Sequence, residues 1–277
     1  MATINEQMIV CYCFIDDYLK AHPDMANWRR SANSHPDLSD AEVLTIALMQ
    51  GSFGVATLKK TYLLIANNYR SAFPKLCSYK QWLARLNALG EITGHLVEAA
   101  RNCEGFEANL FILDSKPIPV CHPIRHGRVR LLREDGAYFG KTSKGWFFGF
   151  KLHVMVNISG HIVGAFLTSG NKDDREAALD LALHADGGIV LGDYGYRSQE
   201  LAQELATEAD MLIVTTADAG RKKPVISSIR ERVETVFSQL WQLFVDRVFS
   251  RSWQGLWNAI RLKLLWHNLR HVNIISA

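Results

Sequence analysis

The chain has 277 residues, of which 48% are hydrophobic, 21% charged and 10% aromatic, a composition that is ordinary for a folded globular protein. Its formal net charge is only +3, so the chain as a whole is nearly neutral. The five cysteines form neither a disulfide framework nor a paired CxxC ligand set, no segment is long enough to span a membrane, and acids near the N-terminus argue against a signal peptide. We therefore expect a soluble cytoplasmic protein.

The first hundred residues carry apolar side chains at helical spacing, and no strand pattern interrupts them. Ser39 and Glu42 form a capping box ahead of an apolar run, and Gly51 and Gly54 are expected to end that helix. The expected helices cover residues 5–20, 43–49, 55–69, 78–89 and 91–101. The sequence therefore predicts an all-α N-terminal domain at residues 1–104.

From residue 108 the chain alternates between strand and helix patterns. Strands are expected at residues 109–113, 146–157, 161–168, 188–191 and 211–215, and helices at 174–185, 198–207, 227–244 and 253–271. The order β-β-β-α-β-α-β-α is that of the ribonuclease H-like fold, an α/β (α+β) core with a mixed five-stranded sheet. We assign residues 105–277, with the C-terminal helices, to this domain. The first and fourth strands are then neighbours.

Three carboxylates occupy positions at which metal-dependent phosphodiester chemistry would need them. Asp114 and Asp193 each end a short apolar run that reads as a buried strand, and Glu234 lies in a helical stretch. In the inferred topology Asp114 and Asp193 face the same cleft. Converging acids repel one another, so we expect a divalent cation as the counter-charge and a raised pKa for at least one of the acids without it.

Basic residues are concentrated in two parts of the chain. Residues 116–144 contain seven Lys and Arg against Glu134 and Asp135, and residues 221–277 contain ten Lys and Arg against three acids. A local basic excess beside an acidic site favours a polyanionic substrate, nucleic acid first. Solvated surface charge is the alternative reading of either segment.

Several motifs together resemble a known family. The segments LDSKPIPVC, GWFFGFKLHVMVN, LTSGNKDD, VLGDYGYRS and RVETVFSQLW are similar to the catalytic core of bacterial insertion-sequence transposases of the DDE class, most of all to the insertion sequence 982 group. The resemblance covers roughly residues 111–270, and LSDAEVLTIALMQ and SYKQWLARL extend it into the N-terminal part. Any one acid could be a turn or surface residue, but the resemblance implies that Asp114, Asp193 and Glu234 are the DDE triad.

The resemblance also implies the reaction and its partners. Two Mg2+ ions, for which Mn2+ is expected to substitute, would be held by the triad during cleavage at the ends of a mobile element and strand transfer into target DNA. The partners would be the terminal inverted repeats, target DNA and further copies of the chain on DNA, in the bacterial nucleoid. The glutamate motif departs from the family pattern, with Ser227 in the usual position of a Tyr and Trp241 in that of a Lys. Arg247 or Lys263 is expected to supply the phosphate contact of that missing Lys.

DNA contacts are expected from residues near the triad and from the helical domain. The residues near the triad are Lys151, Tyr196, Arg197, Lys222, Lys223, Arg230 and Arg247. In the helical domain they are Arg29, Arg30, Lys59, Lys60, Arg70, Lys80 and Arg85. We expect residues 253–271 to form an amphipathic helix with Arg261, Lys263 and Arg270 on its basic side, Trp241 and Trp253 to be candidates for base stacking, and His153 to be buried.

Three alternatives stay open at this point. The same fold could belong to a nuclease that cuts DNA without joining strands, and a strand-transfer assay would separate the two. A DNA-binding regulator could keep the scaffold without catalysis, although the intact triad argues against it. The helical domain could be a structural or dimerising cap instead of a DNA-binding domain.

Overall fold

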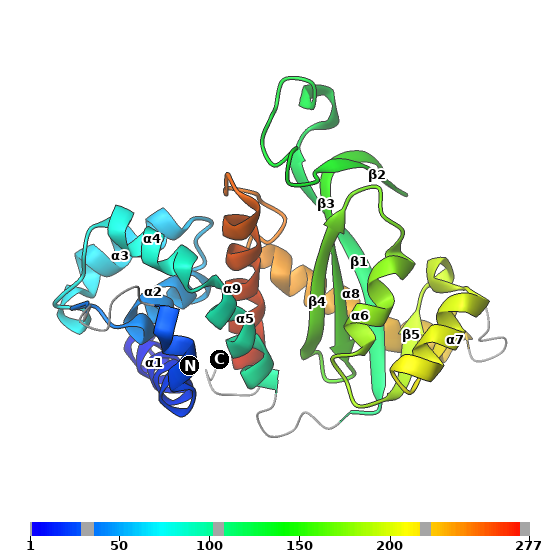
Figure 1. Ribbon diagram of the computed structural model, residues 1–277, viewed down its shortest axis with the longest axis horizontal. Helices are drawn as coiled ribbons and strands as arrows, with labels where there is room; N and C mark the ends of the chain where they lie inside the picture. The colour runs from blue at the N-terminus through cyan, green and yellow to red at the C-terminus, as the bar shows by residue number, and fades with distance from the viewer. Residues whose placement is uncertain (1, 29–35, 102–107, 217–222, 272–277) are drawn as a thin grey trace. The chain divides into compact units, whose positions relative to one another are not determined.

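The computed structural model describes residues 2–28, 36–101, 108–216 and 223–271, which fold into two compact units (Figure 1). One unit is helical and consists of residues 1–104 together with 254–277. The other contains the β-sheet and consists of residues 105–253. The sheet unit thus ends at Trp253, whereas the sequence analysis extended it to residue 277.

The helical unit contains the five N-terminal helices that the sequence predicts, together with the last helix of the chain. Its elements are α1 (Ile4–Ala21), α2 (Asp40–Phe53), α3 (Leu58–Asn68), α4 (Tyr79–Ala88), α5 (Gly90–Arg101) and α9 (Trp253–His271), with short 3-10 helices at Pro23–Trp28 and Arg70–Ala72. The predicted capping box is confirmed: Glu42 N–H donates to the Ser39 hydroxyl, and the Glu42 carboxylate accepts from Ser39 N–H. Helix α2 ends at Gly54, whose φ of 58° is the left-handed conformation that glycine adopts freely.

Helix α9 lies in the core of the helical unit and is buried on almost every side from Leu256 to Leu269. The Asn258 amide donates to Leu86 O at 2.9 Å, and Arg261 Nη1 donates to Gly90 O at 3.1 Å. The amphipathic reading of this helix was therefore wrong. Lys263 is only 7% exposed, so it cannot supply the phosphate contact suggested for it. The cause is tertiary packing, which a helical periodicity in the sequence does not reveal: Lys263 and its neighbours Leu262 and Leu264 are all buried.

Gly51 shows how closely α9 approaches α2. A Cβ at Gly51 would lie 2.4 Å from indole atoms of Trp266, so only glycine fits beneath this ring. Gly51 was expected to help end α2, yet the helix continues to Phe53. Its role is therefore close packing between two helices and not helix termination.

A buried ion pair ties α4 to the start of α2. Arg85 Nη2 lies 2.6 Å from Asp40 Oδ1, and the two side chains are 16% and 3% exposed. The Trp82 indole N–H donates to Val43 O nearby, at 3.1 Å. Arg85 is held by Asp40 at the helix junction, so Asp40 would compete with DNA for its guanidinium group, and a DNA contact by Arg85 stays a prediction.

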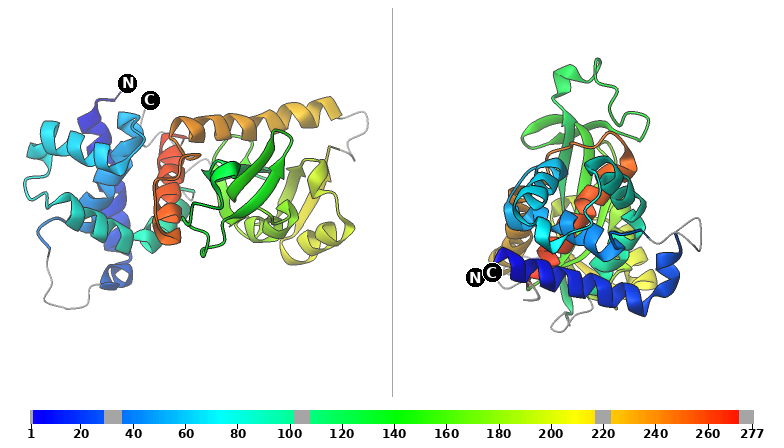
Figure 2. Two further views of the ribbon diagram at one scale, coloured as in Figure 1. Left: turned by 90° about the horizontal axis from the view of Figure 1, so that it is seen from above. Right: turned by 90° about the vertical axis from the view of Figure 1, so that its left-hand side faces the viewer.

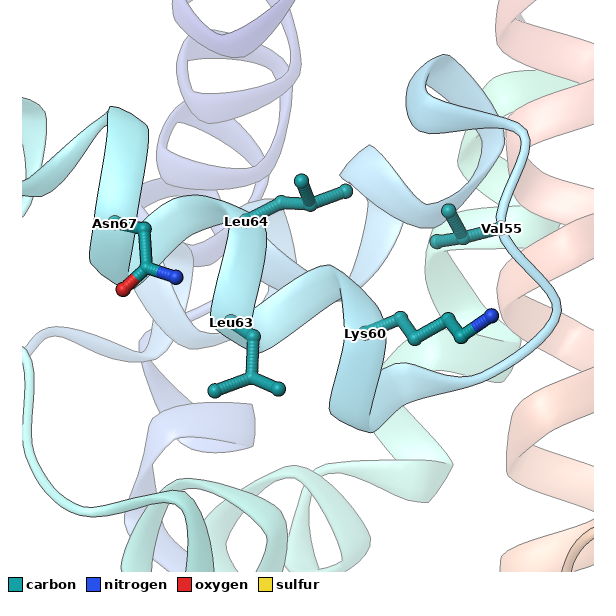
Figure 3. Close-up of a pocket in the computed structure, with 5 residues that line it drawn as sticks. All are labelled: Val55, Lys60, Leu63, Leu64 and Asn67. Carbon is teal, nitrogen blue, oxygen red and sulfur yellow. The ribbon is translucent and has the colours of Figure 1, made fainter.

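A pocket with a mostly apolar lining lies in the helical unit (Figure 3). It is lined by Val55, Lys60, Leu63, Leu64 and Asn67. This set contains no carboxylate, thiol or imidazole, so the pocket has no group suited to acid–base or metal chemistry. In the described segments no single helix is long and apolar enough to cross a membrane. Helices α2 and α3 reach that length and apolarity only when they are taken together, and the angle between them is 100°.

The sheet unit has six strands and the predicted strand order. Its elements are β1 (Leu110–Cys121), β2 (Tyr138–Thr142), β3 (Gly145–Asn157), β4 (Ile162–Ser169), α6 (Ala178–Ala182), β5 (Gly188–Gly192), α7 (Gln199–Glu208), β6 (Met211–Thr215) and α8 (Lys223–Gln242), with 3-10 helices at Pro123–Arg125, Asp174–Ala177 and Tyr194–Tyr196. Strands are ordered β2-β3-β1-β5-β6, and β4 also pairs with β3. The five predicted strands are all present, so the mixed sheet of a ribonuclease H-like core is confirmed.

Two features of the sheet differ from the expectation. Strand β1 does not end at Asp114 but continues to Cys121, because its antiparallel pairing with β3 extends well past its parallel pairing with β5. A sixth strand, β2, pairs with the first part of β3, in a segment expected to be a loop. Gly149 allows this arrangement, since a Cβ there would lie 2.2 Å from Ile118 O on β1.

Helices cover the two faces of the sheet (Figure 2). Side chains alternate along β1, so Phe111 and Leu113 face the apolar cluster that contains residues of α6 and α7. Leu110, on the opposite face, belongs with Leu191 to a cluster that contains Ile226 of α8. Asp114 is in phase with Leu110, so it points to the face that α8 covers.

The buried pair of the helical unit gives a first prediction. Asp40→Ala leaves the Arg85 guanidinium without its carboxylate, and we expect a loss of about 3–5 kcal/mol in the free energy of unfolding. Lys75→Ala is the matched control, because the Lys75–Asp37 pair is 65% and 75% exposed and solvent screening should leave its removal with little effect on stability. Urea denaturation of the two variants and the wild type measures both values. Equal losses in the two variants would contradict the prediction.

Candidate active site

Strand register places Asp114 and Asp193 at the same level of the sheet. Strands β1 and β5 are parallel, and Ile112 is paired with Leu191. Asp114 lies two residues beyond Ile112, and Asp193 lies two residues beyond Leu191, where β5 has ended. The two carboxylates therefore leave neighbouring strands at the carboxyl end of their shared pairing, which is where parallel sheets bind ligands.

The Asp114 carboxylate is mostly buried, with 13% of its side chain exposed. Its Oδ1 accepts the Ser115 N–H at 2.8 Å, and its Oδ2 lies 3.3 Å from Lys116 Nζ. Burial raises the pKa of Asp114, while Lys116, the Ser115 N–H and Arg230 oppose the rise. The predicted rise is present, but its cause is loss of water and not repulsion from the other acids.

Helix α8 brings positive charge to the face of the sheet from which Asp114 points. Arg230 acts electrostatically on Asp114, and Lys116 Nζ lies 5.5 Å from the centre of the Phe237 ring. Glu234 is exposed on the same helix, one turn after Arg230, so both project from the same side of α8. Arg230 is half-buried, and its Nε has no hydrogen-bond partner among the described residues.

The three acids do not close into one metal-binding group. Within the described segments, no set of three or more His, Cys, Asp or Glu side chains is arranged to hold a metal ion. Asp114 and Asp193 are brought to one edge of the sheet, and Glu234 is not brought into a shared ligand set with them. The donor chemistry still fits a hard divalent cation, because carboxylate oxygens are its preferred ligands and the buried Asp114 lacks full compensation.

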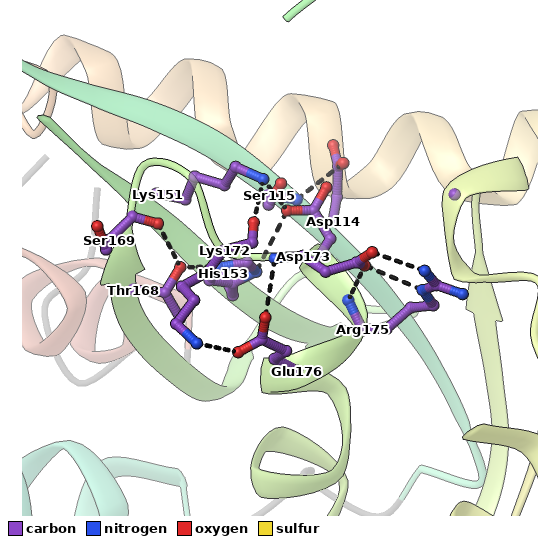
Figure 4. Close-up of polar contacts among 12 residues, drawn as sticks. Asp114, Ser115, Lys151, His153, Thr168, Ser169, Lys172, Asp173, Arg175 and Glu176 are labelled. Atoms are coloured by element: carbon purple, nitrogen blue, oxygen red, sulfur yellow. Dashed lines mark hydrogen bonds and ion pairs between the residues drawn. The ribbon is translucent and has the colours of Figure 1, made fainter. Parts of the chain in front are cut away.

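A polar network that includes Lys151, His153, Thr168 and Lys172 lies beside this edge (Figure 4). Lys151 Nζ lies 2.9 Å from Asp174 Oδ1 and donates to Lys172 O at 2.7 Å. His153 is buried as predicted: its Nε2 is 2.8 Å from the Thr168 hydroxyl, and burial lowers its pKa to about 4. A phosphate contact by Lys151 stays a prediction, and Asp174 would compete for that ammonium group.

Tyr196 does not serve as the surface contact that was expected. Its side chain is only 2% exposed, and its hydroxyl has no hydrogen-bond partner in the described part of the chain. Burial raises the pKa of Tyr196 well above its ordinary value, and the charges of Asp174, Asp114 and Asp193 add to the rise. Tyr196 is therefore a core residue around which these three carboxylates gather.

The remaining predicted DNA contacts have mixed positions. Arg197 is exposed, and Arg247 is exposed with its guanidinium 5.0 Å from the centre of the Phe244 ring. Lys222 and the side chain of Lys223 lie outside the described residues, as do Arg29 and Arg30. The two tryptophans considered for base stacking are half-buried and pack on other rings, Trp241 on Phe237 and Trp253 on Phe150.

Sequence reasoning assigned no role to Asp174 or Lys116, although both contact the site residues. Asp174 stands in the GNKDD motif after a predicted strand, and Lys116 stands two residues after Asp114. Side chains alternate along β1, so Lys116 and Asp114 lie on one face of the strand. This could have been inferred from the sequence only if β1 had been predicted to continue beyond Asp114.

Comparison with known families gives one match. The family model described as "Transposase DDE domain" matches residues 104–245, which span the sheet from β1 to β6 and all of α8. No curated protein matches the chain, and no solved structure does. The matched segment contains Asp114, Asp193 and Glu234.

The raised pKa of Asp114 leads to a second prediction. The folded protein holds the Asp114 proton to a higher pH than the unfolded chain, so ionisation of this group above its ordinary pKa of 3.8 costs stability. The cost grows until the pH passes the raised pKa and is constant above it. We therefore expect Asp114→Asn to be at least as stable as the wild type at pH 7, with the difference vanishing toward pH 3.8.

Thermal unfolding of both proteins across this pH range measures the effect. A variant less stable than the wild type at pH 7 would show that Lys116 and Arg230 stabilise the carboxylate by more than its burial costs.

Proposed function

Because the chain belongs to the transposase DDE domain family, we propose that it cuts DNA at the ends of a mobile element and joins the freed 3′ ends to target DNA. The observation that supports this proposal is the register of β1 and β5, which brings Asp114 and Asp193 to one level, together with the charge of Arg230 on α8 acting on Asp114. Within the family, we propose the insertion sequence 982 group, on the ordered motifs from LDSKPIPVC to RVETVFSQLW.

Transposases of the DDE class generally use divalent metal ions, and we propose that Asp114, Asp193 and Glu234 hold them here. When bound, such ions activate the attacking water or 3′-OH and stabilise the leaving 3′ oxygen. Burial and the hydrogen bond from Ser115 N–H hold the Asp114 side chain in place, so this side chain would lose little conformational entropy on binding a metal ion. Glu234 is exposed on α8 and would be the third ligand of the set.

Two cations of the chain suit the scissile phosphate. Lys116 is 36% exposed beside Asp114, and Arg230 projects from the facing helix with an unpaired Nε among the described residues. A phosphodiester carries negative charge that grows on attack, and fixed positive groups in a partly dry site stabilise that charge. We propose that Arg230 and Lys116 orient the phosphate against the carboxylates.

The proposal predicts the outcome of single conservative changes. Asp114→Asn, Asp193→Asn and Glu234→Gln each keep the side-chain volume but remove one ligand charge. We expect each to lower cleavage of DNA that carries the element's ends by more than about a hundredfold, the upper range for loss of an outer partner of a metal ligand. Cleavage is measured with Mg2+ and with Mn2+. Near-normal cleavage by any one variant would remove that residue from the site.

Strand joining decides between the proposal and a nuclease on the same fold. Pre-cut ends with a free 3′-OH should be joined to a target plasmid by the wild type and not by the Asp193→Asn variant. Cleavage without any joining would favour the nuclease. Binding of terminal DNA without cleavage would favour the regulator.

We also propose that the helical unit binds the element's terminal repeat. Removing residues 1–104 would expose the buried faces of α9, so single charges are the better probe. Lys59 and Lys60 are exposed at the start of α3.

For the Lys59→Gln/Lys60→Gln double variant, we expect the slope of log affinity against log salt to fall by about two units, one per lost phosphate contact. Lys75→Gln is the matched control, because Asp37 already neutralises that lysine at 2.9 Å. An unchanged slope in the double variant would favour a structural or dimerising role for the unit.

A further inference from the structure

The segment between Asp114 and the middle of β3 extends the sheet beyond the core. Strand β5 pairs with β1 only from Leu110 to Ile112, and β4 pairs with β3 only from Phe150 onward. The sheet therefore has an extension at one end, which consists of the rest of β1, strand β2 and the first residues of β3. The loop between β1 and β2 lies above this extension in Figure 1. We call residues 122–149, which contain the loop after β1, strand β2 and the part of β3 that pairs with β2, the basic hairpin.

One face of the basic hairpin carries a row of aromatic rings. Phe139 is paired with Phe148 across β2 and β3, and Lys141 is paired with Trp146, so all four side chains share a face. The Phe139 and Phe148 rings are 5.3 Å apart, and those of Phe139 and Trp146 are 6.5 Å apart. His126 from the loop packs on Phe139 at 4.6 Å. The row ends at Trp146, whose side chain is 62% exposed.

Cations line this row and its surroundings. Lys141 Nζ lies 5.7 Å from the centre of the Trp146 ring, and the Arg133 guanidinium lies 5.7 Å from that of Phe148. The exposed basic residues of the hairpin are Arg125, Arg128, Arg130, Arg133, Lys141 and Lys144. None of the ion pairs found within the described segments involves any of these six.

We propose that the basic hairpin binds unpaired nucleotides of DNA, with Trp146 stacking on a base and Lys141 contacting the adjacent phosphate. An exposed ring with a cation beside it is the arrangement that holds single strands, because every base offers a π-face and every linkage a negative charge. Six exposed cations that join no ion pair in the described segments, against only Glu134 and Asp135, favour a polyanion over an apolar protein partner. The hairpin continues directly from the strand that carries Asp114, and a DNA end opened near that residue presents such nucleotides.

This inference rests on the proposed function, because that function makes DNA the ligand. The test therefore measures binding of DNA separately from its cleavage. All measurements use full-length protein with Asp114→Asn, which leaves the hairpin unchanged and prevents cleavage. The probes are a mixed-sequence duplex with a single-stranded overhang, the same duplex with blunt ends, and the overhang strand alone. Affinities are measured by fluorescence anisotropy at several salt concentrations.

We expect Trp146→Ala to weaken binding of the overhang duplex and of the single strand by roughly 5- to 150-fold, the value of one stacked base. Binding of the blunt duplex should change little, and Trp146→Phe should recover much of the loss. Lys141→Gln should lower the salt slope on the single strand by about 0.7.

Tyr138→Ala is the matched control. Tyr138 is also an exposed aromatic residue of β2, at 57%, but it stands on the opposite face of the hairpin and should leave all three affinities unchanged. Equal losses for Tyr138→Ala and Trp146→Ala would overturn the proposal, as would equal losses on blunt and overhang duplexes.

Unchanged affinities together with an altered oligomeric state of Trp146→Ala would also overturn it, and would assign this face to a second copy of the chain. The proposed function fails separately, if wild-type protein neither cleaves nor joins DNA while the Trp146 effect is present.

Discussion

The parallel pairing of β1 with β5 is the constraint on which the candidate site depends. It covers only three residues of β1, yet it sets Ile112 opposite Leu191 and so brings Asp114 and Asp193 to one level. A slip of one residue would turn Asp114 to the other face of the sheet, away from α8. The buried side chains of Phe111, Ile112 and Leu113 oppose such a slip, because each would have to exchange its apolar surroundings.

The charge around Asp114 follows from this placement. Burial of the Asp114 carboxylate away from water raises its pKa. The positive charges of Lys116 and Arg230 lower the pKa again, but by less than burial raises it. The Asp114 carboxylate can therefore accept further positive charge beyond that of Lys116 and Arg230. Tyr196 and the Lys151–Asp174 ion pair lie beside the same edge of the sheet. Because the Tyr196 and Lys151 side chains are largely buried, they contribute to the packing around the site and offer little surface to solvent.

The structure also redistributes the basic residues that the sequence shows. Lys263 and Arg85 are held inside the helical unit, and Lys151 is held by Asp174. Arg247 and the six cations of the basic hairpin are exposed instead. Six exposed basic residues of the sheet unit thus lie together in the hairpin, whereas several basic residues elsewhere in the chain are held by other groups.

Local patterns in the sequence were sufficient for the helices, the five core strands and their order. Capping boxes and apolar periodicity act over a few residues, so Ser39 and Glu42 reveal the start of α2 without any tertiary contact. The three carboxylates were identified in the same way, from strand ends and family motifs.

What a side chain faces was decided only by tertiary packing. Residues 253–271 have helical periodicity, but α9 is buried at nearly every position from Leu256 to Leu269, including Lys263 on the side that was expected to face water. Strand β1 passes Asp114 because β3 continues to pair with it, a long-range contact that no local pattern records. Tyr196 and Trp146 are both aromatic residues near basic ones in sequence, yet one is buried and the other exposed. Burial depends on residues far along the chain that pack against each ring, and a single sequence read locally does not contain that information.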